Sequence, residues 1–353
     1  MVKTDVAYAA PVLSLQLFFN EMGAAFENAA GGVCETDAFD FTIAGHGVCV
    51  RTAGDGLRSV IYPAMAHLLA GTPDQPALEI SIWDEQSTGI ALPQPPWHIP
   101  QADEKAVFVF PDTDPFQISI SADREVLSIG DRSTNRMFMW IRDASRLFNH
   151  DYAAPLMHIF RTWALSDKLA VVHAGCVGNG EGAVLLVGKG GSGKSTVSLL
   201  SVLHGLDYLS DDYTLVKFGE EPEAFCLYNT GKLHAYHLKR FPELERLAVT
   251  PGADKDGKPL IYLEQHFPGQ IAGQRNLKAI IAPVVTGKPD SALVRISAME
   301  TLKALALSTL FQLRNDDKSA LNKMAGLVKL LPGYRLELGT DIKQIAPLIK
   351  QLL

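Results

Sequence analysis

Just past the middle of the chain the sequence reads Gly188-Lys-Gly-Gly-Ser-Gly-Lys-Ser-Thr196. It matches the phosphate-loop, or Walker A, pattern G-x-x-x-x-G-K-[ST]. Glycines let the backbone turn tightly and aim successive N–H groups at phosphate oxygens, and the dipole of a following helix adds to the attraction. The stretch therefore predicts a nucleotide-binding loop made of Gly188, Gly190, Gly191, Ser192, Gly193, Lys194, Ser195 and Thr196.

Two side chains of this loop have roles that follow from their chemistry. Lys194 can neutralise charge on the terminal phosphates of a nucleotide, and Ser195 offers a hydroxyl to Mg²⁺. We expect Lys194 to be a solvated phosphate contact rather than part of the core. ATP and Mg²⁺ are therefore the expected cofactors.

The residues around the loop have the pattern of an α/β unit. Continuous apolar runs at residues 169–172 and 183–187 predict strands that are buried on both faces. A helix is predicted after the loop, and a third strand after that helix ends at an acidic pair. Further elements are predicted towards the C-terminus. The predicted ranges are residues 196–204 (helix), 206–209 (strand), 279–285 and 293–296 (strands), and 155–165, 298–307 and 342–352 (helices).

The acidic pair Asp211-Asp212 follows Lys194 by 17 and 18 positions. Neighbouring residues on an extended chain point to opposite sides. One carboxylate can therefore reach Mg²⁺ while the other faces an incoming nucleophile. Taken without the loop, the same pair fits an exposed turn, where adjacent aspartates are common.

Three other interpretations of the loop stay open. A glycine-rich turn that binds nothing would have the same strand-turn-helix pattern. Gly188-x-Gly190-x-x-Gly193 also fits the dinucleotide fingerprint, with Asp211 at the distance of a ribose-binding acid, although that fingerprint does not require the Lys-Ser that follows. With its extra Lys189, the loop also resembles the variant phosphate loop of the MinD/ParA-type regulatory ATPases, although those chains usually open with the loop.

Three segments together resemble HPr kinase/phosphorylase and its relatives, which share a core with phosphoenolpyruvate carboxykinase. The segments are His173-Ala-Gly175, the loop itself, and Gly205-Leu-Asp-Tyr-Leu-Ser-Asp-Asp212. The resemblance implies that Asp211 acts as a base on an acceptor hydroxyl and that Asp212 binds the metal beside Ser195. It also implies that His173 lies near the transferred phosphoryl group. A core histidine at a strand end is the alternative for His173.

The chain departs from true HPr kinases downstream of the acidic pair. Their glycine- and arginine-containing signature is absent, and Leu227-Tyr-Asn-Thr-Gly-Lys-Leu233 stands in its place. Lys232 is then either a basic phosphate contact or a surface lysine. The chain resembles more closely the HPr-kinase-related kinases, some of which phosphorylate serine on modified peptides, so HPr as the acceptor and the reverse phosphorolysis are not part of the expectation.

Length and composition favour two globular domains. The chain has 353 residues, of which 47% are apolar and 20% charged. We predict an α+β accessory domain over residues 1–150 and an α/β P-loop kinase domain with a phosphoenolpyruvate carboxykinase-like core over residues 151–353. In the first domain a helix is predicted at residues 57–70, and strands at 39–43, 47–52, 78–83, 106–110, 116–121 and 137–141.

Charge and cysteine usage limit the partners and the compartment. The formal net charge of −7 gives no general attraction to nucleic acid. The four cysteines are scattered without C-x-x-C pairs, which predicts reduced thiols and a cytoplasmic protein. The segment 6–19 is read as the start of a packed domain rather than a signal peptide, and no apolar run is long enough to predict a transmembrane segment.

These features together predict an ATP-dependent kinase. It would transfer the γ-phosphoryl of Mg·ATP to a hydroxyl acceptor, either a serine of a peptide or protein or a small-molecule hydroxyl. The predicted catalytic residues are Asp211, His173 and Lys194, with Ser195 and Asp212 at the metal. A nucleotide-dependent switch without an acceptor is the alternative. The first domain is expected to serve acceptor choice or assembly, including a homo-oligomer.

Overall fold

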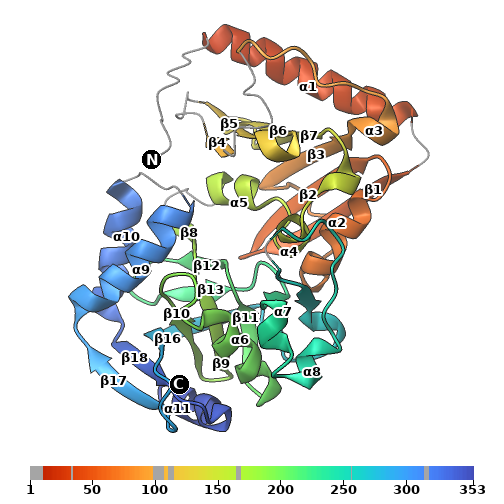
Figure 1. Ribbon diagram of the computed structural model, residues 1–353. Coiled ribbons are helices and arrows are strands. Elements are labelled where there is room, and N and C mark those ends of the chain that lie inside the picture. The colour runs from red at the N-terminus through yellow and green to blue at the C-terminus, as the bar shows by residue number, and fades with distance from the viewer. Residues whose placement is uncertain are drawn as a thin grey trace. The chain divides into compact units, whose positions relative to one another are not determined.

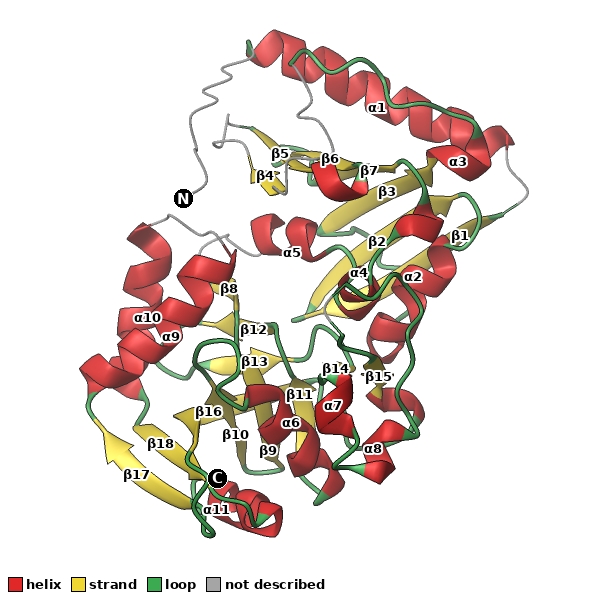
Figure 2. Cartoon of the chain, in the orientation of Figure 1, coloured by secondary structure: helices red, strands yellow, loops and turns green. Residues whose placement is uncertain are grey.

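A computed structural model describes the chain over residues 11–32, 35–97, 107–109, 115–163, 168–255, 257–313 and 318–353. It is a mixed α/β structure with several sheets (Figures 1 and 2). The chain divides into two compact units. Unit 1 comprises residues 1–62, 69–152 and 156–163, and unit 2 comprises residues 63–68, 153–155 and 164–353.

Unit 1 is built on a seven-stranded sheet with the order β1-β2-β3-β7-β6-β5-β4. Strands β2, β3 and β7 run parallel to one another, and the other neighbouring pairs are antiparallel. The strands are β1 (Thr36–Ile43), β2 (His46–Ala53), β3 (Leu78–Asp84), β4 (Val107–Val109), β5 (Phe116–Ser121), β6 (Val126–Asp131) and β7 (Arg136–Ile141). The helices are α1 (Val12–Gly32), α2 (Leu57–Met65), α3 (Glu85–Thr88), α4 (Asn149–Ala153) and α5 (Met157–Trp163). The last residues of α2, from residue 63, and of α4, at residue 153, belong to unit 2.

The predicted strands of this unit are present, most with shifted ends, and residues 106 and 110 of the predicted strand at 106–110 lie outside the described residues. Strand β6 and helices α1, α3 and α4 were not predicted. Helix α1 is the longest of these helices. Its buried side chains recur at helical spacing and pack with Trp83 and Phe138 in one apolar core. They are Leu15, Phe18, Phe19, Met22, Ala25, Phe26 and Ala29.

Unit 2 contains a nine-stranded sheet and a separate two-stranded one. The strands are β8 (Leu169–Val172), β9 (Gly175–Asn179), β10 (Gly182–Leu186), β11 (Asp207–Ser210), β12 (Thr214–Lys217), β13 (Glu223–Phe225), β14 (Thr230–Lys232), β15 (Leu260–Tyr262), β16 (Gln274–Val285), β17 (Ala292–Ile296) and β18 (Gly333–Leu338). The helices are α6 (Lys194–Leu203), α7 (Ala235–Leu238), α8 (Pro242–Glu245), α9 (Ala298–Leu313), α10 (Lys318–Leu330) and α11 (Ile345–Lys350).

The strand directions in unit 2 bring two chain turns to one edge of the sheet. Strand β9 lies between β10 and β11 and is antiparallel to both, so β10 and β11 run in the same direction. The carboxyl ends of these two strands therefore share an edge. The residues that follow β10 are the glycine loop, residues 188–196, and those that follow β11 are the acidic pair.

Strand β10 shows why its sequence is apolar throughout. Its side chains alternate between two buried cores, with Val184 and Leu186 in one and Ala183 and Leu185 in the other. The first core includes side chains of α6, α8 and α11, and the second includes side chains of α9 and α10. Helices thus cover both faces of this part of the sheet (Figure 2), which confirms the prediction of strands buried on both sides.

Most elements predicted for this unit are present, some with shifted ends. They are the strands at residues 169–172, 206–209, 279–285 and 293–296 and the helices at 196–204 and 298–307. The helix at 155–165 is α5 of unit 1, and residues 164 and 165 lie outside the described residues. The helix at 342–352 begins as a 3-10 turn, Ile342–Gln344, and continues as α11. Strands β9, β12, β13, β14, β15 and β18 and helices α7, α8 and α10 were not predicted.

Cys49, Cys176 and Cys226 are free thiols, and Cys34 lies outside the described residues. Within the described ranges, every helix falls short of the length and apolarity that crossing a membrane requires.

Candidate functional site

The glycine loop leaves the end of β10 and enters helix α6 through backbone angles that need glycine. Gly188, Gly191 and Gly193 have φ values of 136°, 79° and 105°, a region that residues with side chains rarely adopt. At Gly193 a Cβ atom would also lie 2.6 Å from Cδ1 of Leu338. The loop is therefore fixed both by its own conformation and by strand β18 behind it.

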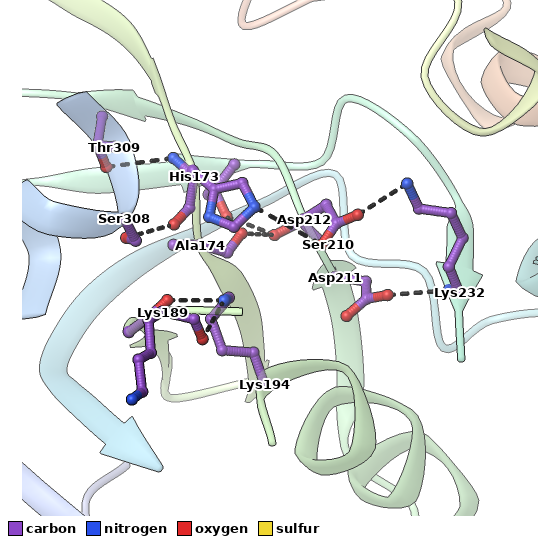
Figure 3. Close-up of polar contacts among 12 residues, drawn as sticks. His173, Ala174, Lys189, Lys194, Ser210, Asp211, Asp212, Lys232, Ser308 and Thr309 are labelled. Carbon is purple, nitrogen blue, oxygen red and sulfur yellow. Dashed lines mark hydrogen bonds and ion pairs between the residues drawn. The ribbon is translucent and has the colours of Figure 1, made fainter. Parts of the chain in front are cut away.

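Lys194 is folded back over the loop. Its Nζ donates hydrogen bonds to the carbonyl oxygens of Gly188, at 2.8 Å, and Lys189, at 3.4 Å (Figure 3). The residue is only 6% exposed, so the prediction of a solvated lysine is wrong. The reason is geometric, because the first turn of α6 directs the side chain back across the loop rather than outward. Burial lowers the pKa of Lys194, and the charges of Asp212 and Asp211 oppose that effect.

Asp211 follows β11 directly and is buried, with 2% of its surface exposed. Its Oδ2 accepts a hydrogen bond from the main-chain N–H of Lys232 at 2.9 Å, and its buried Oδ1 has no hydrogen-bond partner among the described residues. Burial and the adjacent charge of Asp212 raise the pKa of Asp211 to about 7. The Lys232 N–H and the Ser195 hydroxyl act in the opposite direction but do not cancel the rise.

Asp212 has the opposite electrostatic character. Its carboxylate lies 2.9 Å from Nζ of Lys232 and its side chain is 24% exposed (Figure 3). Burial alone would raise the pKa of Asp212, but the ammonium of Lys232 outweighs burial and lowers the pKa below its usual range. Two adjacent carboxyl groups therefore have pKa values displaced in opposite directions, which is typical of sites that combine a proton acceptor with a permanent anion.

His173 lies on the other side of Asp212, with its Nε2 3.9 Å from Oδ1 of that residue. Burial lowers the pKa of His173 to about 4, so the imidazole is neutral near pH 7 and the contact is not an ion pair at that pH. Helix α9 holds the main chain of His173 on both sides. Thr309 Oγ1 accepts from its N–H at 3.3 Å, and Ser308 Oγ donates to its carbonyl oxygen at 2.9 Å (Figure 3).

Lys232 is the residue whose role the sequence left undecided, and the surface-lysine alternative is wrong. It ends the short strand β14, and its side chain is 15% exposed. Strand β14 packs directly on helix α6, because a Cβ at Gly231 would lie 2.4 Å from Cδ2 of Leu199. The charge of Asp212 holds the pKa of Lys232 above its usual range although burial alone would lower it.

Sequence reasoning missed the polar residues that brace the acidic turn. The Ser210 and Thr214 hydroxyls contact each other, and both donate to the carbonyl oxygen of Ala174, at 3.1 and 2.8 Å. Their positions just before and just after the acidic pair are the only signal that could have found them. Ser308 and Thr309 give no such signal, since they lie more than 130 positions beyond His173.

A small pocket lies beside the two acids. Its lining includes Asp211, Asp212 and Lys232, together with polar and aromatic neighbours. The other lining residues are Ala153, Ala154, Tyr208, Ser210, Tyr213, Tyr228 and Thr230, all outside the glycine loop. The glycine loop does not contribute to this lining.

The oxygen atoms near the loop suit Mg²⁺. Carboxylate and hydroxyl oxygens are its preferred protein ligands, and phosphates and waters commonly complete its shell. The Ser195 hydroxyl lies close enough to Asp211 to lower its pKa. Among the described residues, Oδ1 of Asp211 is a buried acceptor without a hydrogen-bond partner. The neighbouring carboxyl of Asp212 is ionised, because its pKa is lowered. In the described part of the chain, no three His, Cys, Asp or Glu side chains form a metal site on their own. The residues thus fit a cation that arrives with a nucleotide.

Comparisons with known proteins add little to this geometry. No protein-family model matches the chain, and no curated protein matches it. Among solved structures, the HPr(Ser) kinase/phosphatase from Coxiella burnetii is similar at 13% sequence identity and a TM-score of 0.29, over 52% of this chain and 92% of that chain. The likeness is distant, so the functional proposal below rests on the site.

Proposed function

We propose that the chain is an ATP-dependent kinase that transfers the γ-phosphoryl group of Mg·ATP to a hydroxyl acceptor. The single observation that carries the proposal is the shared sheet edge. Strands β10 and β11 run in the same direction and end in the glycine loop and in an acidic pair whose two pKa values are displaced in opposite directions. A loop that binds phosphates would then place the terminal phosphate beside a base and an anion.

The binding step assigns distinct tasks to residues of the loop. Its main-chain N–H groups hold the phosphates, and Lys194 exchanges its two carbonyl partners for phosphate oxygens. Ser195 and Asp212 would hold Mg²⁺, which neutralises charge on the phosphates when bound. Because Lys194 is already fixed across the loop, little side-chain freedom is lost when the nucleotide arrives.

The transfer step assigns the proton to Asp211. Its Oδ1 has no hydrogen-bond partner in the described part of the chain, its carboxyl lines the pocket, and its pKa of about 7 suits a base that works at neutral pH. The acceptor hydroxyl would donate its proton to Oδ1 as its oxygen forms a bond to phosphorus and the bond to the ADP oxygen breaks. His173 is neutral at this pH, so we assign it hydrogen bonding to the transferred group rather than charge neutralisation.

The dinucleotide alternative fits this geometry less well. It requires the acid after β11 to face a ribose hydroxyl. Asp211 is 2% exposed, and its Oδ2 already accepts the main-chain N–H of Lys232. Strand β9 also separates β11 from β10. Titration calorimetry with Mg·ATP and with NAD checks this choice, and tight NAD binding without ATP binding would refute the kinase.

The test of catalysis is acceptor labelling. Full-length protein is incubated with γ-labelled ATP, Mg²⁺ and fractionated cell extract, and labelled products are identified by mass spectrometry. We expect label in a hydroxyl-bearing product with the wild-type chain and none with Asp211→Asn, which should still bind Mg·ATP. Release of labelled phosphate without any labelled product would instead identify a nucleotide-hydrolysing switch.

A further inference from the structure

Lys232 contacts both acids with different groups of the same residue. Its main-chain N–H donates to Oδ2 of Asp211 at 2.9 Å, and its Nζ lies 2.9 Å from Oδ2 of Asp212 (Figure 3). The main chain of Lys232 therefore positions Asp211, the proposed base, while its side chain forms an ion pair with Asp212, the proposed metal ligand. These two functions are separable, since a substitution at Lys232 changes the second contact and leaves the first.

The main chain of Lys232 is held firmly. Strand β14 pairs with β15. The phenol of Tyr208 donates to the carbonyl oxygen of Thr230 at 2.5 Å, and the Thr230 hydroxyl donates to the carbonyl oxygen of Ala153 at 2.5 Å. With the backbone fixed, only the four-carbon stem of Lys232 can move its ammonium, and lysine stems have that freedom.

The ammonium of Lys232 and a divalent cation need the same carboxylate. Asp212 is partly exposed and ionised, and Lys232 holds its Oδ2. Lys194 cannot substitute for Lys232 there without giving up its bonds to the loop carbonyls. The positive charge of Lys232 therefore weakens the binding of a divalent cation to this carboxylate, and an ammonium displaced in such half-buried surroundings needs a new anion.

We infer that Lys232 first guards the proposed metal ligand and then acts as a catalytic residue: its ammonium pairs with Asp212 in the nucleotide-free protein and, when nucleotide and metal are bound, moves to contact the phosphoryl group being transferred. The inference rests on the proposed kinase function. Lys232 and both acids line the same pocket, so the released ammonium stays beside the reacting groups. The arrangement keeps the site from binding metal without nucleotide.

The test measures metal binding without nucleotide. Mn²⁺ affinity of the full-length chain is determined by electron paramagnetic resonance for the wild type, Lys232→Gln, Lys232→Arg and the control Lys217→Gln. We expect Lys232→Gln to bind bare Mn²⁺ more tightly, by on the order of tenfold, because the competing charge is gone. Lys232→Arg should match the wild type. Lys217 pairs with Glu223 on the surface, so its loss changes net charge equally without affecting Mn²⁺.

A second readout separates guarding from a merely structural role. With Mg·ATP, Lys232→Gln should keep nucleotide affinity within a few-fold while turnover falls by on the order of a hundredfold, and Lys232→Arg should restore part of it. If the glutamine variant does not fold, Lys232→Met keeps the apolar stem and allows the same comparison. Unchanged or weaker Mn²⁺ binding in a folded, uncharged variant overturns the inference. Failure of the wild type to bind or transfer from Mg·ATP would instead overturn the proposed function.

Discussion

The substitutions Asp211→Asn and Asp212→Asn are chemically identical and adjacent, yet we expect opposite effects on stability. Asp211 is buried and its pKa is raised from 3.8 to about 7. A carboxyl group with a raised folded-state pKa contributes stability that is present at low pH and is lost as pH rises through the folded pKa. Ionised Asp211 therefore destabilises the wild type at neutral and alkaline pH, and a neutral asparagine removes that penalty.

The magnitude follows from the two pKa values. One pKa unit corresponds to about 1.4 kcal/mol, so the displacement of Asp211 costs the wild type at most about 4 kcal/mol above pH 7. Between pH 5 and pH 8 the penalty grows by about 2–3 kcal/mol. The asparagine keeps an oxygen that accepts the Lys232 N–H, so this growth is the quantity to compare rather than the absolute difference.

Asp212→Asn removes the anion beside Lys232 and leaves a half-buried ammonium without its partner. Its free energy of unfolding should fall by about 1–3 kcal/mol at pH 7, less than for a fully buried pair because both side chains are partly exposed. The pKa of Asp212 is lowered, so this loss should shrink only as pH falls towards the acid range.

Urea unfolding of the three full-length proteins between pH 5 and pH 8.5 measures both effects. We expect the difference in free energy of unfolding between Asp211→Asn and the wild type to increase in favour of the variant as pH rises. The free energy of unfolding of Asp212→Asn should stay below that of the wild type throughout. A stability difference for Asp211→Asn that does not change with pH would refute the reasoning. So would a loss of similar size in both variants, because it would mean that both acids are ionised and paired.

Three further predictions concern the loop and the units. Lys194→Ala should abolish Mg·ATP binding in calorimetry without lowering the melting temperature, because a buried ammonium is removed together with its desolvation cost. Gly193→Ala should cost about 2–5 kcal/mol in urea unfolding, since it combines a φ of 105° with a clash against Leu338, and Gly190→Ala, with no atom within 4 Å of its Cβ, is the matched control. A fragment spanning residues 151–353 should unfold more easily than unit 2 of the full chain, because the buried Asn229 amide loses its bonds to the carbonyl oxygens of residues 63 and 64; equal protease resistance of fragment and full chain would contradict this.

The sequence predicted those parts of the fold whose cause is local. Strands β8 and β10 were recognisable because both faces of each are buried, which leaves a continuous apolar run. Strand β9 was missed because its Gly175-Cys-Val-Gly-Asn sequence has neither alternation nor bulk. Its glycines are needed for close packing: a Cβ at Gly178 would lie 2.1 Å from the carbonyl oxygen of Gly182.

The sequence predicted the identity of the site residues better than their environment. The loop and the acidic pair were found because each is a short run whose spacing has a chemical reason. The burial of Lys194 was predicted wrongly, and the role of Lys232 could not be decided. Both depend on contacts with residues distant in sequence, since Lys232 meets Asp212 only because β14 packs on α6. A pKa displaced by such contacts has no signature in the sequence.

The fate of the γ-phosphoryl group distinguishes a kinase from a nucleotide-hydrolysing switch. Wild type and Asp211→Asn are compared at equal Mg·ATP saturation, with γ-labelled ATP and a fractionated cell extract, and acid-stable labelled products are counted against labelled free phosphate. The account predicts a labelled hydroxyl product that requires Mg²⁺ and the wild-type carboxyl of Asp211. Label found only in free phosphate, or equal labelling by Asp211→Asn, would contradict it.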